Sequence, residues 1–130
     1  MLAGIGVDIA ETARFERLQQ RFGDRIARRI LTEREFDRYL QRQRSATFLA
    51  SRFAAKEAAS KALGTGIARG VHFHDIEISN NEAGKPELSF HGTAAEMLRQ
   101  RGIRQSLLSL SDEKHYAVAM VVLEAGDPAC

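Results

Sequence analysis

The spacing of apolar residues predicts that the chain opens with a short strand and continues into an amphipathic helix. Residues 2–8 form an apolar run with glycines two positions apart, which is typical of a β-strand. A helix is expected to begin near Glu11 or Thr12. Its apolar positions recur three or four residues apart, at Phe15, Leu18 and Phe22. Gly23 is expected to close this helix.

Three further helices are expected before the midpoint of the chain, each with an N-terminal signal. Asp24 is expected to cap a short second helix. Thr32 and Glu35 have the spacing of a capping box, which predicts the start of a third helix. Ser45 is expected to cap a long fourth helix. That helix should end at Gly64, where a left-handed residue is favourable.

The second half of the chain predicts mainly strands. The expected strands occupy residues 73–79, 87–90, 106–111 and 115–124. One helix is expected between them, opened by a capping box of Thr93 and Glu96 and ending at Gly102. The last strand has apolar residues at both odd and even positions, so both of its faces should be covered, either by helices or by another subunit. We expect one α+β domain over residues 1–130, with helices mainly in the first half packed on an antiparallel sheet.

Composition narrows the class of protein only slightly. The chain is 44% hydrophobic and 28% charged, as in ordinary globular proteins. It has no apolar run near the roughly 20 residues that a membrane span needs. Cys130 is the only cysteine, which excludes an internal disulfide and a cysteine-based zinc site. A reducing, cytoplasmic location is the simplest interpretation.

Positive charge is concentrated in one stretch of the chain. The formal net charge is only +2, but residues 14–44 contain ten arginines and five acidic residues. Five of these arginines recur three or four positions apart and are expected to form a basic ridge: Arg14, Arg17, Arg21, Arg25 and Arg28. Two interpretations stay open here, a surface for an anionic partner and solvated helix faces without a partner.

Two acidic residues stand in contexts that favour a metal site. Asp8 ends the opening apolar strand, where a carboxylate can hold a hard cation, although a helix cap or turn is the alternative. On a helical wheel, Glu57 falls among small and apolar residues, and burying an unpaired carboxylate is costly. We therefore expect Glu57 either to pair with Lys61, four residues on, or to share a cation with Asp8.

Two segments resemble the signatures of the 4′-phosphopantetheinyl transferase family. Residues 6–9 read Gly-Val-Asp-Ile and are followed by Arg14, similar to the family's G-x-D and downstream arginine. Residues 52–64 read RFAAKEAASKALG, similar to its F-x-x-K-E-A-x-x-K-A-x-G. The resemblance covers nearly the whole chain and includes residues 64–66, 84–86 and 116–119. The chain length resembles the short bacterial branch that acts on acyl carrier protein, rather than the double-length transferases.

The resemblance implies a 4′-phosphopantetheinyl transferase-like α+β fold and an activity. The implied reaction transfers 4′-phosphopantetheine from coenzyme A to a serine of apo acyl carrier protein, releases adenosine 3′,5′-bisphosphate and supports fatty acid biosynthesis. Asp8 and Glu57 match the family's magnesium-binding acids, and Lys61 matches a catalytic lysine that contacts phosphate. Residues that match the family's nucleotide surroundings are Arg52, Lys56, Ser60, Lys61, Gly64 and Lys85. Arg14 matches the start of the helix that meets the acidic carrier protein.

The resemblance also implies a homotrimer with active sites between subunits, and neither nucleic acid nor membrane as a partner. One position departs from the pattern, because Asp112 follows Ser111 where many members carry histidine. Any contribution of that histidine is therefore not carried over to this chain.

Phosphoryl transfer depends mainly on positioning and on neutralising phosphate charge, which suits these residue types. The expected general base is a water made more acidic by magnesium, since an unperturbed Lys61 is protonated at neutral pH. A nucleic-acid-binding module would explain the arginines but leaves Asp8 and Glu57 without a role. A magnesium-dependent phosphohydrolase would use the two acids but not the ridge.

Overall fold

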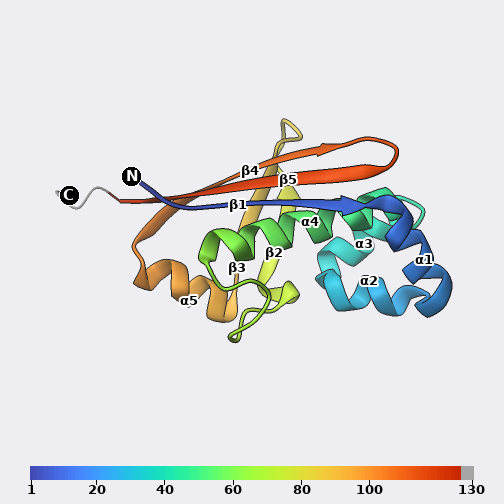
Figure 1. Ribbon diagram of the computed structural model, residues 1–130, viewed down its shortest axis with the longest axis horizontal. Helices are drawn as coiled ribbons and strands as arrows, with labels where there is room; N and C mark the ends of the chain where they lie inside the picture. The colour runs from blue at the N-terminus through green and yellow to red at the C-terminus, as the bar shows by residue number, and fades with distance from the viewer. Residues whose placement is uncertain (127–130) are drawn as a thin grey trace.

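Three long antiparallel strands and one long helix form the centre of the molecule (Figure 1). The computed structural model describes residues 1–126. Strands β1 (Leu2–Glu11) and β4 (Ile103–Asp112) both pair with the middle strand β5 (Tyr116–Ala125), which gives the order β1-β5-β4. The helix α4 (Ala46–Leu63) packs along one face of this sheet.

Shorter elements surround this centre. The other helices are α1 (Thr12–Phe22), α2 (Asp24–Ile30), α3 (Glu33–Gln41), α5 (Gly92–Gln100) and the single 3-10 turn η1 (Phe73–Asp75). Strands β2 (Ile76–Asn80) and β3 (Pro86–Phe90) form a second, two-stranded antiparallel sheet. Over the described part of the chain, none of these helices is long and apolar enough to cross a membrane. Cys130 lies outside the described residues.

Three of the expected helix signals are confirmed. Thr32 and Glu35 form a complete capping box, in which the amide of Thr32 donates to Oε1 of Glu35 at 2.8 Å. The hydroxyl of Ser45 accepts from the amide of Phe48 at 3.1 Å and starts α4. Gly64 ends α4 with a φ of 85°, a left-handed conformation that glycine adopts without steric cost.

Three other local expectations are corrected. Asp24 is the first residue of α2, and its carboxylate pairs with Arg44 at 3.0 Å instead of capping the helix. The Thr93–Glu96 capping box does not form, because α5 begins two residues earlier than that box requires, at Gly92, with His91 as its N-cap. The strand expected after the glycine-rich loop begins three residues late, because its first residues form η1.

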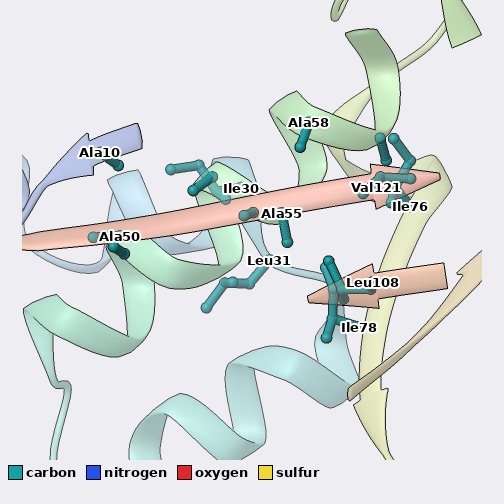
Figure 2. Close-up of a cluster of buried hydrophobic side chains, with 14 of the residues drawn as sticks. Ala10, Ile30, Leu31, Ala50, Ala55, Ala58, Ile76, Ile78, Leu108 and Val121 are labelled. Atoms are coloured by element: carbon teal, nitrogen blue, oxygen red, sulfur yellow. The ribbon is translucent and has the colours of Figure 1, made fainter. Parts of the chain in front are cut away.

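The hydrophobic core lies between α4 and the sheets. Alanines of α4, including Ala55, pack beside Val121 of β5, Leu108 of β4 and Ile76 of β2 (Figure 2). All four residues are at most 7% exposed. Because alanine side chains are small, the helix backbone lies close to the sheet.

β1 and α4 approach so closely that two strand positions leave no room for a side chain. A Cβ atom on Gly6 would overlap the carbonyl oxygen of Ala58, and one on Gly4 would overlap that of Ala62. Side chains alternate between the two faces of a strand, so Asp8 shares the α4 side with both glycines. The alternating glycines of the sequence therefore bring Asp8 close to α4.

The opposite face of the three-stranded sheet is apolar and exposed. Exposed apolar side chains of β1 and β5 on this face include Ile5 (67%), Ile9 (63%), Val7 (57%), Met120 (44%) and Val118 (37%). The inward positions of β5 are buried against α4, from Ala117 to Leu123. Among residues 1–126, the expected cover of both faces is therefore found only on the α4 side.

Candidate active site

Asp8 lies within β1 rather than at its end, because the strand continues to Glu11. Its Oδ1 accepts a hydrogen bond from the Nζ of Lys61 at 2.9 Å. Its Oδ2 is buried and has no hydrogen-bond partner. Buried polar atoms are normally satisfied, so an unpartnered carboxylate oxygen points to a group that binds there.

Glu57 is the second carboxylate of this site and lies on α4, one turn before Lys61. Burial raises the pKa of its carboxyl group, and the charge of Asp8 raises that pKa further, whereas Lys61 and Arg14 lower it. Gly6 of β1 lies against Ala58 of α4, the residue after Glu57, so Asp8 and Glu57 come from adjoining parts of the two elements. The ammonium of Lys61 donates to Asp8 and to the carbonyl oxygen of Val7 at 3.2 Å. Lys61 thus pairs with the strand rather than along the helix with Glu57.

Two neighbouring carboxylates, one with an unpartnered oxygen, suit a hard divalent cation such as Mg²⁺. Magnesium is commonly held by one or two protein carboxylates and completes its shell with waters and substrate oxygens. Among residues 1–126, no group of three or more histidine, cysteine, aspartate or glutamate side chains is placed to hold a metal. Asp8 and Glu57 would therefore leave most coordination positions to substrate and water.

A cleft of about 500 Å³ opens beside Glu57, between α1, α2, α4 and η1. Three arginines line it, Arg14, Arg25 and Arg29. Its apolar lining includes Phe15, Leu18, Phe22, Ile26, Phe53 and Phe73. The guanidinium of Arg14 lies 5.2 Å from the centre of the Phe53 ring, a cation–π contact that holds it at the cleft. The cleft thus combines positive charge and apolar surface next to a carboxylate.

The five arginines of the expected ridge do not all face this cleft. Arg28 stacks on Phe36 at 4.0 Å and lines a separate depression beside α3. Arg17 and Arg21 are exposed on α1, outside the cleft lining. Arg29 was not among the expected ridge residues, although it follows Arg25 by four positions and the same helical spacing would have found it.

A second, polar cleft of about 300 Å³ is lined by Arg52, Arg42 and Asp112, among others. Arg52 is only 6% exposed, and burial lowers the pKa of its guanidinium. Its Nη2 lies 3.4 Å from Oδ1 of Asn80, and its buried Nε has no partner. A buried guanidinium with an unused donor suits an anionic ligand. Arg52 precedes Glu57 by five residues, which places it about 140° around α4 from Glu57.

The remaining residues expected around the nucleotide lie in different places. Lys56 is fully buried and turned into the protein. Ser60 is also buried, and its hydroxyl donates to the carbonyl oxygen of Glu57 at 2.8 Å. Gly64 is the exposed end of α4, and Lys85 is exposed in the turn between β2 and β3. Their contacts with a nucleotide stay predictions, and the orientation of Lys56 does not favour one.

The fold and site together define an enzyme class that handles phosphorylated substrates, with paired acids, a lysine and an arginine-lined cleft. The family model of the 4′-phosphopantetheinyl transferase superfamily matches residues 4–121, and the chain belongs to this superfamily. The match spans both motif segments and every element from β1 to the middle of β5.

Curated relatives and solved structures agree with this membership. The holo-[acyl-carrier-protein] synthase of Vibrio atlanticus (strain LGP32) is 55% identical over 124 residues, which cover 95% of this chain and 98% of that protein. The crystal structure of the synthase of that name from Neisseria meningitidis has a TM-score of 0.88 and 44% identity, covering 95% of this chain and 99% of that one. The Helicobacter pylori synthase, solved in complex with coenzyme A, has a TM-score of 0.81 and 32% identity, covering 92% and 99% of the two chains.

Proposed function

We propose that this chain is a holo-[acyl-carrier-protein] synthase, which transfers 4′-phosphopantetheine from coenzyme A to a serine of apo acyl carrier protein. The observation that carries the proposal is the ion pair of Asp8 with Lys61, one helical turn from Glu57, which lines the arginine-rich cleft. Its close relatives carry this name over nearly their full length. The proposal treats residues 1–130 as one domain that acts in the cytoplasm in support of fatty acid biosynthesis.

Asp8 and Glu57 are the residues that would hold Mg²⁺. The fit is supported by the unpartnered Oδ2 of Asp8 and by the effect of Asp8 on the pKa of Glu57. When bound, the ion neutralises negative charge on the pyrophosphate of the donor. The ammonium of Lys61 pairs with the carboxylate of Asp8 and would bind phosphate oxygens of the donor.

The transfer forms one bond and breaks one. The serine oxygen of the carrier bonds to the β-phosphorus of coenzyme A, and the hydroxyl proton passes to water. The bond from that phosphorus to the bridging oxygen breaks, and adenosine 3′,5′-bisphosphate leaves with the bridging oxygen. Little covalent chemistry is required of the protein, so its residues act by positioning and by neutralising charge.

The polar cleft around Arg52 supports a second contact with the donor. Coenzyme A carries a 3′-phosphate in addition to its pyrophosphate, so it presents two separated anionic groups. A buried guanidinium with an unused donor suits one of them, and the Asp8–Glu57 pair with a cation suits the other. The two clefts lie on different sides of α4, which favours a donor held between two subunits.

The exposed sheet face supports the same arrangement. Ile5, Val7 and Ile9 expose more than half of their surface on one face of β1, next to Val118 and Met120 of β5. A continuous apolar face of this kind is typical of a protein interface. We propose that other copies of the chain cover it in a homotrimer, with active sites at the subunit boundaries.

The arginine-lined cleft supports an acidic protein as the acceptor. Arg14 and Arg25 line it together with Glu57, so a carrier protein docked there would present its serine to the phosphate site. Positive charge around the cleft would speed the encounter with an acidic carrier, and salt would weaken this effect.

One assay tests the proposal and separates it from hydrolysis. The protein is incubated with coenzyme A, Mg²⁺ and apo acyl carrier protein, and the carrier is weighed by mass spectrometry. We expect the carrier to gain one phosphopantetheine. Release of adenosine bisphosphate from an unmodified carrier would instead show a phosphohydrolase, and no turnover of coenzyme A would reject both.

A further inference from the structure

The ammonium of Lys56 joins two walls of the cleft that contains Glu57. Lys56 is 0% exposed, and its three donors all meet protein oxygens. Its Nζ lies 2.6 Å from Oε1 of Glu35, 2.7 Å from the carbonyl oxygen of Ile30 and 3.0 Å from that of Phe73. Ile30 and Phe73 both line the cleft.

Each of the two carbonyls belongs to the end of a short element, and a hydrogen bond between His74 and the carbonyl oxygen of Arg28 also joins these two elements. Ile30 is the last residue of α2, so its carbonyl is one of those that a helix leaves without an internal partner. Phe73 is the first residue of η1, which follows the glycine-rich loop. A single buried ammonium therefore fixes α2 and η1 against α4.

Glu35 completes this network from the other side. Its Oε1 accepts from Lys56 and from the amide of Thr32 at 2.8 Å, and its Oε2 accepts from the amide of Ile78 at 2.8 Å. Glu35 is 3% exposed, so both charges of the pair are held in the interior. The network connects α2, α3, α4, η1 and β2 at one point.

We infer that Lys56 is a positioning residue for the carrier-binding cleft, and that it does not contact the nucleotide. Lys56 directly precedes Glu57 in α4. The helical turn that places the Glu57 carboxylate at the cleft therefore also anchors the cleft walls on which Arg25, Arg29 and Phe73 lie. Loosening this anchor should move the arginines relative to Glu57 and weaken docking of the carrier. The inference rests on the proposed transfer reaction.

The test replaces both charges at once, because removing one partner leaves the other buried and unpaired. In Lys56→Met with Glu35→Gln, we expect the KM for apo acyl carrier protein to rise about tenfold or more, with the KM for coenzyme A changed less than about twofold. Lys56→Arg keeps a positive charge opposite Glu35 and should give a smaller rise in the same constant. A direct Kd for the carrier, measured by fluorescence anisotropy without coenzyme A, should rise in parallel.

Stability is controlled with Leu108→Ala, a core change in β4 on the sheet side of α4. It should lower the melting temperature and leave both KM values unchanged. A rise in the KM for coenzyme A alone, or unchanged carrier binding in a folded variant, overturns the inference. If the double variant does not fold, Lys56→Arg, which keeps the charge pair and changes its geometry, decides by the same two constants. A wild-type chain without transfer activity would reject the proposed function, whereas the carrier Kd still tests the positioning role.

Discussion

The ammonium of Lys61 lies 2.9 Å from the carboxylate of Asp8, although the two residues are 53 positions apart in the sequence. This ion pair joins the first strand to the last turn of the central helix. The lysine side chain is 48% exposed and that of the aspartate 15% exposed, so solvent and ligands reach the pair from the lysine side. A cation at Asp8 and phosphate oxygens at Lys61 would satisfy the two charges separately when substrate binds.

Loss of either carboxylate should abolish transfer without unfolding the chain. We expect Asp8→Asn or Glu57→Gln to lower the transfer rate by about 100-fold or more, because pyrophosphate charge is then poorly neutralised. The ion pair of Asp8 is partly exposed and contributes little to stability, so the circular dichroism spectrum should not change. Asp37→Asn, an exposed acid on α3, is the matched control. Full activity of either site variant at low Mg²⁺ would reject the proposed ligation.

The raised pKa of Glu57 predicts a pH-dependent stability in the absence of metal. Burial and the charge of Asp8 make the folded chain hold this proton more tightly than the unfolded chain does. The free energy of unfolding should therefore fall as pH rises from the ordinary glutamate pKa of 4.5 through the higher pKa of the folded state. Urea unfolding in EDTA across this range should show the fall in the wild type and a flatter profile in Glu57→Gln.

Added Mg²⁺ extends the same experiment. Because the cation binds the ionised carboxylates, it should stabilise the wild type increasingly as pH rises and have little effect on Glu57→Gln. A stability of the wild type that does not respond to Mg²⁺ at any pH would contradict the assignment of Glu57 as a ligand.

Replacing Gly6 by alanine should separate β1 from α4. The new Cβ would overlap the carbonyl oxygen of Ala58, and a backbone oxygen cannot move aside without moving the helix. We expect a loss of about 1–3 kcal/mol in the free energy of unfolding, measured with urea. Ser89→Ala on the exposed face of β3 should change stability by less than about 0.5 kcal/mol. A Gly6→Ala variant as stable as the wild type would show that the close contact is dispensable.

Charge reversal on α1 should act on one substrate only. Arg14→Glu combined with Arg21→Glu is expected to raise the KM for acyl carrier protein about tenfold or more and to leave that for coenzyme A nearly unchanged. In the wild type, the KM for the carrier should rise with salt. Arg104→Glu, on the exposed side of β4, serves as the control. Equal effects on both substrates would count against a carrier surface on α1.

Subunit mixing tests whether the donor binds between copies of the chain. Asp8→Ala and Arg52→Met should each have little activity alone. When the two variants are coexpressed, part of the activity should return, because some sites in a mixed trimer combine a native Asp8 from one subunit with a native Arg52 from its neighbour. Asp8→Ala mixed with Glu57→Ala should regain none, because these two acids come from the same chain.

Met120→Lys, on the exposed sheet face, should yield a smaller particle in light scattering. A wild type that is monomeric in solution would reject the proposed trimer with active sites between subunits.

The local signals of the sequence predicted the helices well. The box of Thr32 and Glu35, the cap at Ser45 and the left-handed Gly64 each depend on residues within a few positions, and all three are present. The opening strand and the final hairpin were also placed. β1 and β4 run longer than expected, because pairing with β5 extends them beyond their most apolar residues, whereas β5 has the expected length and begins one residue later.

Features that depend on tertiary contacts were harder to predict. The motif placed Asp8 and Glu57 in one site, but nothing in the spacing indicated that Lys61 would pair with Asp8 across 53 residues. The burial of Lys56 depends on its contacts with α2, α3 and η1, and nothing in the residues around it in the sequence indicates those contacts. Arg42 lines the second cleft because the turn before α4 places it there, and no periodic pattern indicated that.

The side chains of β1 alternate between the two faces of the sheet, and this restricts how the sequence of the strand can evolve. Its even-numbered residues, from Gly4 to Asp8, face α4 and the candidate active site, while Ile5, Val7 and Ile9 face the opposite side of the sheet. Inserting or deleting one residue in the strand would exchange the two faces. Asp8 would then leave the site it shares with Glu57 and Lys61 and would lie among the apolar residues of the opposite face. Substitutions can therefore adjust either side alone, whereas length changes in this strand must damage both.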